Sequence, residues 1–208
     1  MSDNTPEQWD AAYADHDDLP PWVIDEAQPE VVTLIDGGLL TGRLLDSGCG
    51  TGEHSLLARN NGLDVLGVDI SRNAIEIARR KAVDRALDVE FRVVNMLEPI
   101  PFHDAAFDTV LDSGVFHSFE GAGQHAYVSN LTRVTKPGGV LHLICFSEHQ
   151  PGEGEWGPRR ITQSEIRSAF ADGWSVGEIE PAVYRIKEFH DTTHVKAWRA
   201  LLHRDSMG

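Results

Sequence analysis

Leu44-Leu45-Asp46-Ser47-Gly48-Cys49-Gly50-Thr51-Gly52-Glu53 is the stretch that decides the fold class of this 208-residue chain. The apolar pair at its start predicts a short buried strand, and the residues from Glu53 to Asn61 predict a helix. The glycines between them allow a tight backbone turn and let a ligand approach the peptide planes. This order of strand, glycine-rich turn and helix is typical of parallel α/β sheets that bind a ligand where the strand ends.

Short β-branched runs alternate with helical patterns along the chain that follows. Further strands are predicted at 64–69, 89–94, 107–112 and 140–146. One helix is predicted to start after Ser71, and another runs from Gln124 to Thr135, with Lys136-Pro137-Gly138-Gly139 as its stop signal. Nearly continuous apolar strands joined by helices indicate a parallel sheet that is covered on both faces.

The two flanks of this core have different patterns. Residues 7–16 and 29–40 predict two helices before the first strand. After a polar loop rich in glycine and proline, Thr162-Gln163-Ser164-Glu165 is a capping box for one more helix. Residues 174–182 and 192–203 then predict two strands, which we expect to form a hairpin at one edge of the sheet.

We therefore expect an α/β fold with a three-layer, Rossmann-like sheet, mostly parallel, with an antiparallel edge hairpin and an N-terminal helical cap. The length fits a single domain at 1–208. The expected parts are the cap at 1–42, the ligand-binding core at 43–147, a candidate lid loop at 148–160, and a C-terminal helix with edge strands at 161–208. A loop of that length in a compact domain is usually either a functional lid or mobile.

Charge and composition exclude several classes of partner. The chain has 18 Lys and Arg against 33 Asp and Glu, a formal net charge of −15, which disfavours nucleic acids and anionic lipid surfaces as partners. The N-terminus lacks a signal-peptide pattern, and no apolar run is long enough to span a membrane. With only two cysteines, both in core-like contexts, we expect reduced thiols and a cytoplasmic location. The ten histidines are scattered, so we expect no metal site.

Acidic residues around the glycine-rich turn indicate the charge of the ligand. Asp69 ends the second strand, where a carboxylate can accept both hydroxyls of a ribose. Asp46 precedes the first glycine, and Glu53 stands where the dinucleotide fingerprint requires glycine. A carboxylate at position 46 repels a pyrophosphate and suits an ammonium group, which favours a cationic or zwitterionic nucleoside ligand over NAD.

With these features, the chain resembles the class I S-adenosylmethionine (SAM) methyltransferases. The resemblance covers residues 29–147 and rests on Leu44–Ser55, Gly67-Val68-Asp69-Ile70-Ser71, Asn95-Met96, Phe107–Asp112 and Lys136–Gly139. One departure is Asn95, where the family places an acidic residue against the adenine; its side-chain oxygen can still accept a hydrogen bond. The resemblance implies SAM as cofactor and S-adenosylhomocysteine (SAH) as product.

The flanks carry a narrower resemblance. The segment from Pro20-Pro21-Trp22 to Gln28-Pro29-Glu30 is similar to one in the thiopurine, thiol and halide methyltransferases. Asp112-Ser113-Gly114-Val115-Phe116-His117-Ser118 is similar to a segment of bacterial heterocyclic-toxin methyltransferases. This branch implies a small acceptor, with methyl transfer to an O, N or S atom of an aromatic heterocycle or to a thiol.

The resemblance also implies roles for individual residues. The cofactor would be held by Trp22, Asp46, Gly48, Cys49, Gly50, Asp69, Ile70, Asn95, Met96 and Asp112. The acceptor pocket would include Tyr13, Phe116 and Trp156. His117, just past the fourth strand, either positions the acceptor or takes its proton, and the alternative is a histidine that satisfies a local backbone group. Asp112 either orients its surroundings or is a structural acid at a strand end.

Two other functions stay open from the sequence. One is a methyltransferase for a protein or a quinone, which a broad, open groove would favour. The other is a SAM-binding regulatory or scaffold protein without turnover, which would bind SAM and SAH but methylate no acceptor. The sequence leaves the oligomeric state open.

Overall fold

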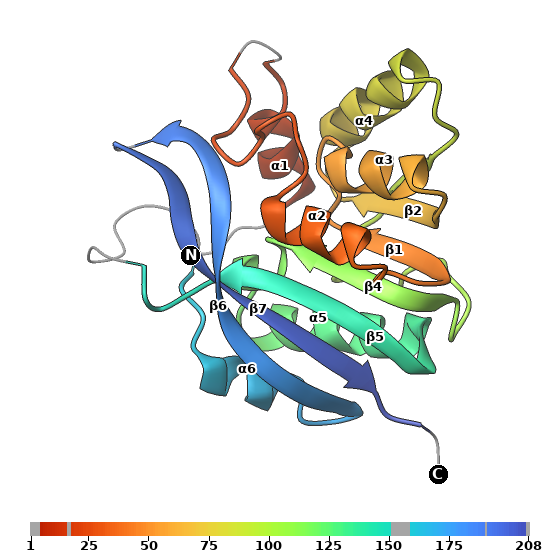
Figure 1. Ribbon diagram of the computed structural model, residues 1–208, viewed down its shortest axis with the longest axis vertical. Helices are drawn as coiled ribbons and strands as arrows, with labels where there is room; N and C mark the ends of the chain where they lie inside the picture. The colour runs from red at the N-terminus through yellow and green to blue at the C-terminus, as the bar shows by residue number, and fades with distance from the viewer. Residues whose placement is uncertain (1–4, 16–17, 151–158, 190, 207–208) are drawn as a thin grey trace.

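The computed structural model describes residues 5–15, 18–150, 159–189 and 191–206. These residues form a seven-stranded sheet of order β3-β2-β1-β4-β5-β7-β6 (Figure 1). The strands are β1 (Arg43–Ser47), β2 (Asp64–Asp69), β3 (Glu90–Val93), β4 (Phe107–Ser113), β5 (Thr135–Phe146), β6 (Trp174–Phe189) and β7 (Thr192–Arg204). Strands β1 to β5 pair in parallel, and β7 is antiparallel to both of its neighbours. The predicted mostly parallel sheet with an antiparallel edge hairpin is confirmed.

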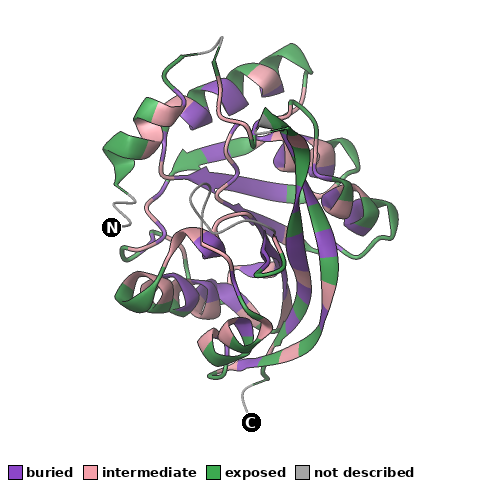
Figure 2. Cartoon of the chain, turned by 90° about the vertical axis from the view of Figure 1, so that its left-hand side faces the viewer, coloured by how far each residue is buried: buried purple, intermediate pink, exposed green. Residues whose placement is uncertain are grey.

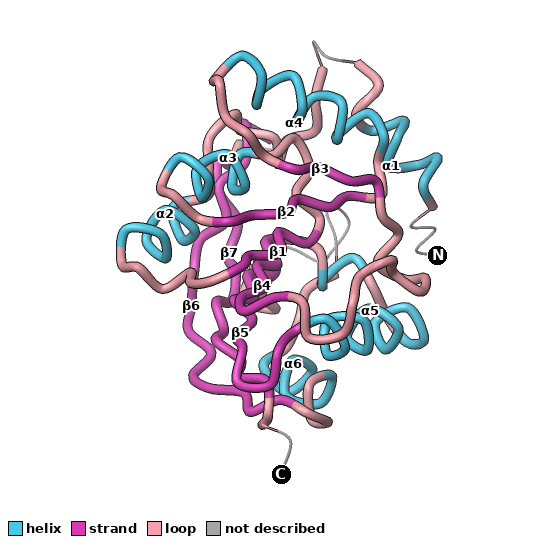
Figure 3. The backbone as a smooth tube through the Cα atoms, turned by 90° about the vertical axis from the view of Figure 1, so that its right-hand side faces the viewer, coloured by secondary structure: helices cyan, strands magenta, loops and turns pink. Residues whose placement is uncertain are grey.

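Helices lie on both faces of this sheet, so the predicted three layers are confirmed. The helices are α1 (Pro6–Ala12), α2 (Pro29–Asp36), α3 (Glu53–Asn60), α4 (Arg72–Asp84), the 3₁₀ helix η1 (Phe116–Ser118), α5 (Gly121–Val134) and α6 (Gln163–Ala169). Figure 3 shows α2 and α3 on one side of the strands and α5 and α6 on the other. No helix in the described part of the chain is both long and apolar enough to cross a membrane.

The strands are buried on both faces because successive side chains point to opposite layers. Leu44 packs in a cluster with Val31 and Leu34 of α2, whereas Leu45 packs in a cluster with Tyr127 and Leu131 of α5. Figure 2 shows the central strands as buried and the outer sides of the helices as exposed. The apolar residues that gave no alternating pattern in the sequence are therefore core residues of a covered sheet.

The turn predicted at residues 136–139 lies inside a strand. Helix α5 ends at Val134 as its stop signal requires, but β5 begins directly at Thr135, which pairs with Phe107. The register then shifts, and regular pairing resumes where Val140 faces Thr109. The extra residues form a bulge-like irregularity in which Gly138 has a φ of 78°.

Other boundaries differ from the predicted ones at the two ends of the chain. Helix α2 ends at Asp36 and not near residue 40, because Gly37 and Gly38 follow it and Gly38 has a φ of 66°. Helix α1 also ends earlier than predicted, at Ala12. At the other end, β6 continues past residue 182 to Phe189. This extension carries the edge hairpin beyond the sheet core and toward the N-terminal segment.

Candidate active site

A cavity of about 710 Å³ lies where β1, β2 and β4 end. Its lining comes from the glycine-rich turn, the N-terminal segment and the edge hairpin, which are far apart in the sequence. The carboxyl ends of parallel strands are the usual ligand site of such sheets, and volumes of this order hold small molecules. The cavity is therefore the candidate active site.

The glycine-rich turn forms the wall of the cavity next to β1. The backbone N–H groups of Gly48 and Cys49 both donate to the carbonyl oxygen of Val68 at 2.8 Å. Gly48 has a φ of 72°, and a Cβ atom there would lie 2.0 Å from a methyl carbon of Val115. Only glycine fits this position, because a side chain would be strained in conformation and would overlap Val115.

Asp69 lies at the end of β2 against the same turn. One carboxylate oxygen accepts from Gly50 N–H at 2.8 Å and the other from Ser71 N–H at 2.9 Å. Burial raises the pKa of Asp69 to about 6, although these two backbone donors oppose the rise. Each oxygen keeps a second lone pair, so the carboxylate can still accept hydrogen bonds from a ligand in the cavity.

Asp46 lies beneath the turn and is only 1% exposed. Its Oδ2 accepts a 2.6 Å hydrogen bond from the hydroxyl of Ser55, but its Oδ1 has no partner in the described part of the chain. Burial raises the pKa of Asp46, while the nearby His54 and the Ser55 bonds lower it. An unsatisfied buried carboxylate oxygen is costly, which indicates a partner that is not a protein group.

Residues after β2 and β3 form the next part of the wall. Ile70, Asn95 and Met96 all line the cavity. The Asn95 side chain is engaged in its own turn: Oδ1 accepts from Leu97 N–H at 3.0 Å and Nδ2 donates to Glu98 at 2.9 Å. These bonds fix the loop, and they leave one lone pair of Asn95 Oδ1 for a ligand donor.

The N-terminal segment covers the cavity opposite the strands. Tyr13 is 4% exposed and lines the cavity, and its hydroxyl oxygen accepts a 3.0 Å hydrogen bond from the indole N–H of Trp22. Trp9 packs edge-on against Trp22 at 6.0 Å between ring centroids. The same hydroxyl of Tyr13 lies 3.4 Å from the position that a Cβ of Gly50 would occupy, so the cap lies directly over the turn.

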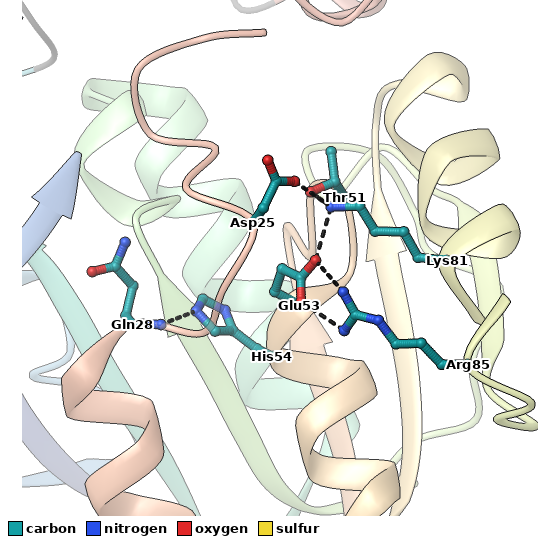
Figure 4. A network of polar contacts seen from close by, with 7 residues as sticks. All are labelled: Asp25, Gln28, Thr51, Glu53, His54, Lys81 and Arg85. Carbon is teal, nitrogen blue, oxygen red and sulfur yellow. Dashed lines mark hydrogen bonds and ion pairs between the residues drawn. The ribbon is translucent and has the colours of Figure 1, made fainter. Parts of the chain in front are cut away.

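Gln28 joins the N-terminal segment to the edge hairpin. Its side-chain amide donates to the carbonyl oxygen of Arg185 at 2.9 Å and accepts from Arg185 N–H at 2.8 Å, as a neighbouring strand would. Its backbone N–H donates to His54 Nε2 at 3.2 Å (Figure 4). Gln28 is 2% exposed and lines the cavity, so it closes the gap between the cap, α3 and β6.

A network of charged residues fastens the same segment on its other side (Figure 4). The ammonium group of Lys81 lies 2.9 Å from Asp25, 2.8 Å from Glu53 and 3.2 Å from the hydroxyl of Thr51. Arg85 adds a bidentate pair with Glu53, at 2.8 and 2.9 Å. Glu53, at the position that separates this turn from the dinucleotide fingerprint, is thus an anchor for α4 and the cap.

The edge hairpin and β5 form an apolar wall that the sequence analysis missed. Phe146, Tyr184, Ile186 and Val195 line this part of the cavity. The signal was present in the sequence, where Tyr184 and Ile186 alternate with the charged residues Arg185 and Lys187; in the structure the first pair is buried and the second exposed. It was overlooked because the predicted strand ended at residue 182.

His117 lies in η1 directly after β4 and lines the cavity at 5% exposure. Its Nδ1 accepts a 3.0 Å hydrogen bond from the backbone N–H of Phe146, and its ring lies 4.5 Å from the Phe146 ring. Burial, helped by the positive charge of Arg159, lowers the pKa of His117 to about 3. The ring is therefore neutral at physiological pH and is held at the apolar wall.

Comparison with known proteins identifies the family. Residues 45–143 match the methyltransferase domain family. The chain is 28% identical to 2-heptyl-1-hydroxyquinolin-4(1H)-one methyltransferase of Mycobacteroides abscessus, over 89% of each protein, and 27% identical to probable thiol methyltransferase 2 of Arabidopsis thaliana, over 79% of this chain and 72% of that one. A solved structure described as "Conversion of a Disulfide Bond into a Thioacetal Group during Echinomycin Biosynthesis" superposes with a TM-score of 0.87 at 33% identity, covering 98% of this chain and 93% of that one.

The chain belongs to the class I SAM-dependent methyltransferases. The family assignment drawn from the glycine-rich turn and the later motifs is confirmed. Ten residues of the methyltransferase that were predicted for the site do line the cavity, namely Tyr13, Trp22, Gly48, Cys49, Gly50, Asp69, Ile70, Asn95, Met96 and His117. Their individual roles stay predictions.

Three predicted residues lie elsewhere in the methyltransferase. Phe116 is fully buried and packs 5.4 Å from Phe170, on the side of α6, so it does not line the cavity as an acceptor-pocket residue would. Asp112 is also fully buried, and its oxygens accept from the N–H groups of Val115 and Phe116 and from the Tyr127 hydroxyl. These contacts fit the structural alternative for Asp112. Because Asp112 does not line the cavity, nothing places it in contact with a cofactor there. Asp46 lies below the lining, as described above.

The long loop gives less information about the methyltransferase site. Trp156 and most of the expected lid at 148–160 lie outside the described residues. Arg159 lines the cavity, and its guanidinium donates to the carbonyl oxygen of Phe119 and pairs with Glu165 at 2.7 Å. It is therefore engaged by the protein itself. Within the described ranges, no cluster of histidine, cysteine or acidic side chains is arranged to hold a metal ion.

Proposed function

We propose that this methyltransferase transfers the methyl group of SAM to an O, N or S atom of a small aromatic heterocycle or of a thiol. The observation that carries the proposal is the cavity, which has two chemically different walls. One wall is the glycine-rich turn with Asp69, which suits a nucleoside. The other wall is apolar and aromatic, with His117 as a polar group, and suits a flat or sulfur-containing acceptor.

The residues of the first wall fit SAM. Asp46 Oδ1 is buried without a partner among the described residues, and an ammonium group would satisfy it directly or through water. Asp69 has lone pairs left for the two ribose hydroxyls, and Ile70 and Met96 would contact the adenine. When bound, SAM supplies a methyl group that is already activated on a sulfonium sulfur.

The rest of the site would orient the acceptor and exclude water. The Trp22 ring, held by Tyr13, and the hairpin residues Tyr184 and Ile186 would hold a flat acceptor between cap and sheet. Such positioning lowers the barrier because the two reactants are held in line and water is excluded. His117 would either position the nucleophilic atom or take its proton.

The relatives support a small acceptor. The names of the two curated relatives describe a hydroxyquinolone and a thiol as acceptors, and the superposed solved structure is described by the conversion of a disulfide bond, which is chemistry at sulfur. The cap supports the same class, because Tyr13 and Trp22 cover the cavity on the side opposite the strands and leave it a volume of about 710 Å³, which suits a small acceptor. The cytoplasmic location and the domain boundaries drawn from the sequence stay predictions.

The test is SAH release with SAM and a panel of acceptors: hydrosulfide, an aryl thiol, a hydroxyquinolone, a reduced quinone, a phenol and an unfolded protein. We expect turnover with the aryl thiol or the hydroxyquinolone. Asp69→Asn should reduce it, whereas Asp88→Asn, an exposed acid outside the cavity, should not. Turnover of the protein or quinone alone would contradict the acceptor class. Calorimetric binding of SAH without any turnover would indicate a binding protein instead.

A further inference from the structure

The tautomer of His117 is fixed by its contact with β5. A backbone N–H group can only donate, so the 3.0 Å bond from Phe146 N–H requires an unprotonated Nδ1 on His117. In a neutral imidazole the single proton then lies on Nε2. No described residue accepts a hydrogen bond from this Nε2–H, and the ring lines the cavity.

A ring in this state cannot accept a proton from an acceptor molecule. Nε2 already carries its proton, and the lone pair of Nδ1 is occupied by Phe146 N–H. Protonation would require the Phe146 bond to break inside an apolar environment, where burial holds the pKa of His117 at about 3. The charged group that acts on the ring is Arg159, and its positive charge opposes protonation as well.

The other acids of the cavity are engaged. Glu53 pairs with Lys81 and Arg85, Glu26 with Arg185, and Glu120 with Arg159, while Asp69 accepts from two backbone N–H groups. Asp112, behind the lining, accepts from Val115 and Phe116 N–H and from the Tyr127 hydroxyl. His54 also lines the cavity, and its Nε2 accepts from Gln28 N–H. Apart from the lone pairs of Asp69 that the ribose would take, the described lining therefore offers an acceptor hydrogen-bond donors and no free base.

A second donor lies at the end of β4. Ser113 lines the cavity, and its hydroxyl oxygen is buried with no hydrogen-bond partner in the described part of the chain. Tyr184 donates to the carbonyl oxygen of the same residue at 3.3 Å, so that oxygen is already used. Two donors without a partner among the described residues, Ser113 O–H and His117 Nε2–H, thus lie at and just after the end of β4, beside the apolar rings of Phe146 and Tyr184.

We propose that His117 is a fixed hydrogen-bond donor that selects acceptors entering the cavity as anions, namely thiolates and ionised hydroxy- or N-hydroxy-heteroaromatics. This inference rests on the proposed function and gives the charge state of its acceptor. The anion supplies the electron pair of the new bond to the methyl carbon, and the methyl–sulfur bond breaks toward the sulfonium sulfur. The charges of −1 and +1 cancel, and no proton moves. His117 is then a positioning donor for the nucleophile and not a general base.

The first test uses a series of aryl thiols of equal shape whose ring substituents change the pKa of the thiol. We expect kcat/KM to rise with pH and to level off at the pKa of each thiol, so that the midpoint moves with the acceptor. A midpoint that stays constant across the series would report an enzyme base and overturn the inference. If no acceptor is methylated, the proposed function fails, and the spectroscopic test below still decides the state of His117.

Variants separate the donor from a base. His117→Gln keeps an N–H donor and cannot act as a base, whereas His117→Leu keeps neither property. We expect His117→Leu to lower kcat/KM by about 10- to 100-fold, the effect of a hydrogen bond to a charged group, and His117→Gln to retain most of the rate. Equal losses in both variants would overturn the inference. His125→Gln, an exposed histidine on α5, is the matched control.

The second test reads the tautomer without turnover. We expect ¹⁵N chemical shifts of histidine-labelled protein with SAH to show an Nε2-protonated, neutral His117 from pH 5 to pH 8. The His117→Gln spectrum assigns the signal. A charged ring or an Nδ1-protonated ring in this range would overturn the inference even if the enzyme is active.

Discussion

Asp69 combines burial with a ligand-binding position, and this gives SAH binding a pH dependence. In the proposed function the ionised carboxylate accepts from the ribose hydroxyls, and burial raises the pKa of Asp69 to about 6. The affinity for SAH should therefore rise as the pH increases through about 6 and stay constant above it. Asp69→Asn should weaken binding by about 10- to 100-fold and remove the pH dependence. Calorimetric titration at several pH values checks both, and a pH-independent wild type would contradict the assignment.

Gln28 is a second residue whose effect can be measured, this time on stability. Gln28→Ala removes both bonds to Arg185 and leaves a backbone N–H and C=O at the strand edge without partners. We expect the free energy of unfolding in urea to fall by about 1–3 kcal/mol. Gln163→Ala is the control, because that side chain makes one long bond of 3.4 Å and should change stability little. Equal losses in both variants would show that the strand-like pairing contributes nothing specific.

For single residues, the sequence predicted which side chains lie near the ligand site, but it did not predict the direction in which each side chain points. The spacing of Gly48, Gly50 and Asp69 located one wall of the cavity, because turns and strand ends follow from local sequence. Phe116 and His117 are neighbours in one short 3₁₀ helix, yet one faces the core and the other the cavity. A helix of three residues is too short to show a hydrophobic periodicity, so the sequence does not reveal which residue faces the core and which the cavity.

Among the helices and strands, α4 is notable because polar contacts at both of its ends fix the N-terminal segment. At its start, the Asp10 carboxylate of α1 accepts from Ser71 Oγ at 2.9 Å and from Arg72 N–H at 2.6 Å. Ser71 is the N-cap of α4, and the N-terminus of a helix is a favourable position for the negative charge of Asp10. At its end, Lys81 pairs with Asp25 and Glu53. The cap is therefore attached to a helix that also packs on the sheet.

The attachment at Lys81 can be tested by removing the charge and keeping the methylene chain. Lys81→Met should lower the free energy of unfolding by about 1 kcal/mol, because the Lys81 and Glu53 side chains are only 18% and 10% exposed and solvent screens them little. Arg92→Met is the control, since its pair with Glu90 is 44% and 50% exposed and should contribute close to nothing.

The same two variants test whether the attachment serves the cavity. If Lys81 holds the cap over the turn, Lys81→Met should also weaken SAH binding and expose the N-terminal segment to limited proteolysis. Arg92→Met should change neither measurement. Weakened stability with unchanged SAH affinity would mean that the network stabilises α4 alone and does not close the site.

The element boundaries show why the second wall of the cavity was missed. Helix-to-strand alternation predicted the parallel strands, since each strand carries its own apolar run. The end of β6 is different, because Tyr184 and Ile186 alternate with charged residues and carry no continuous apolar run. Their strand is also joined to Gln28, whose contact with Arg185 spans more of the chain than any local pattern can show.

For the whole molecule, the formal charge of −15 predicts a response to salt. An excess of like charge destabilises the compact state, and this repulsion is screened when the Debye length falls from about 30 Å at 0.01 M to about 8 Å at 0.15 M ionic strength. We expect the Tm to rise over this range by more in sodium chloride than in sucrose of equal osmolarity, because sucrose stabilises folded proteins by exclusion from their surface but screens no charge. A Tm that falls with salt would mean that ion pairs such as Lys81–Glu53 outweigh the net repulsion.

The position of β7 has a consequence for how the molecule is made. This strand is later in the chain than β6 but lies between β6 and β5 in the sheet. A chain emerging from the ribosome therefore completes β6 before the strand that joins it to the sheet exists. Until β7 is made, Tyr184 and Ile186 cannot take their places in the apolar wall of the cavity. The other wall, the glycine-rich turn with Asp69, can already fold. In the proposed function, the wall expected to hold the nucleoside is therefore complete before the wall expected to hold the acceptor, which requires β7.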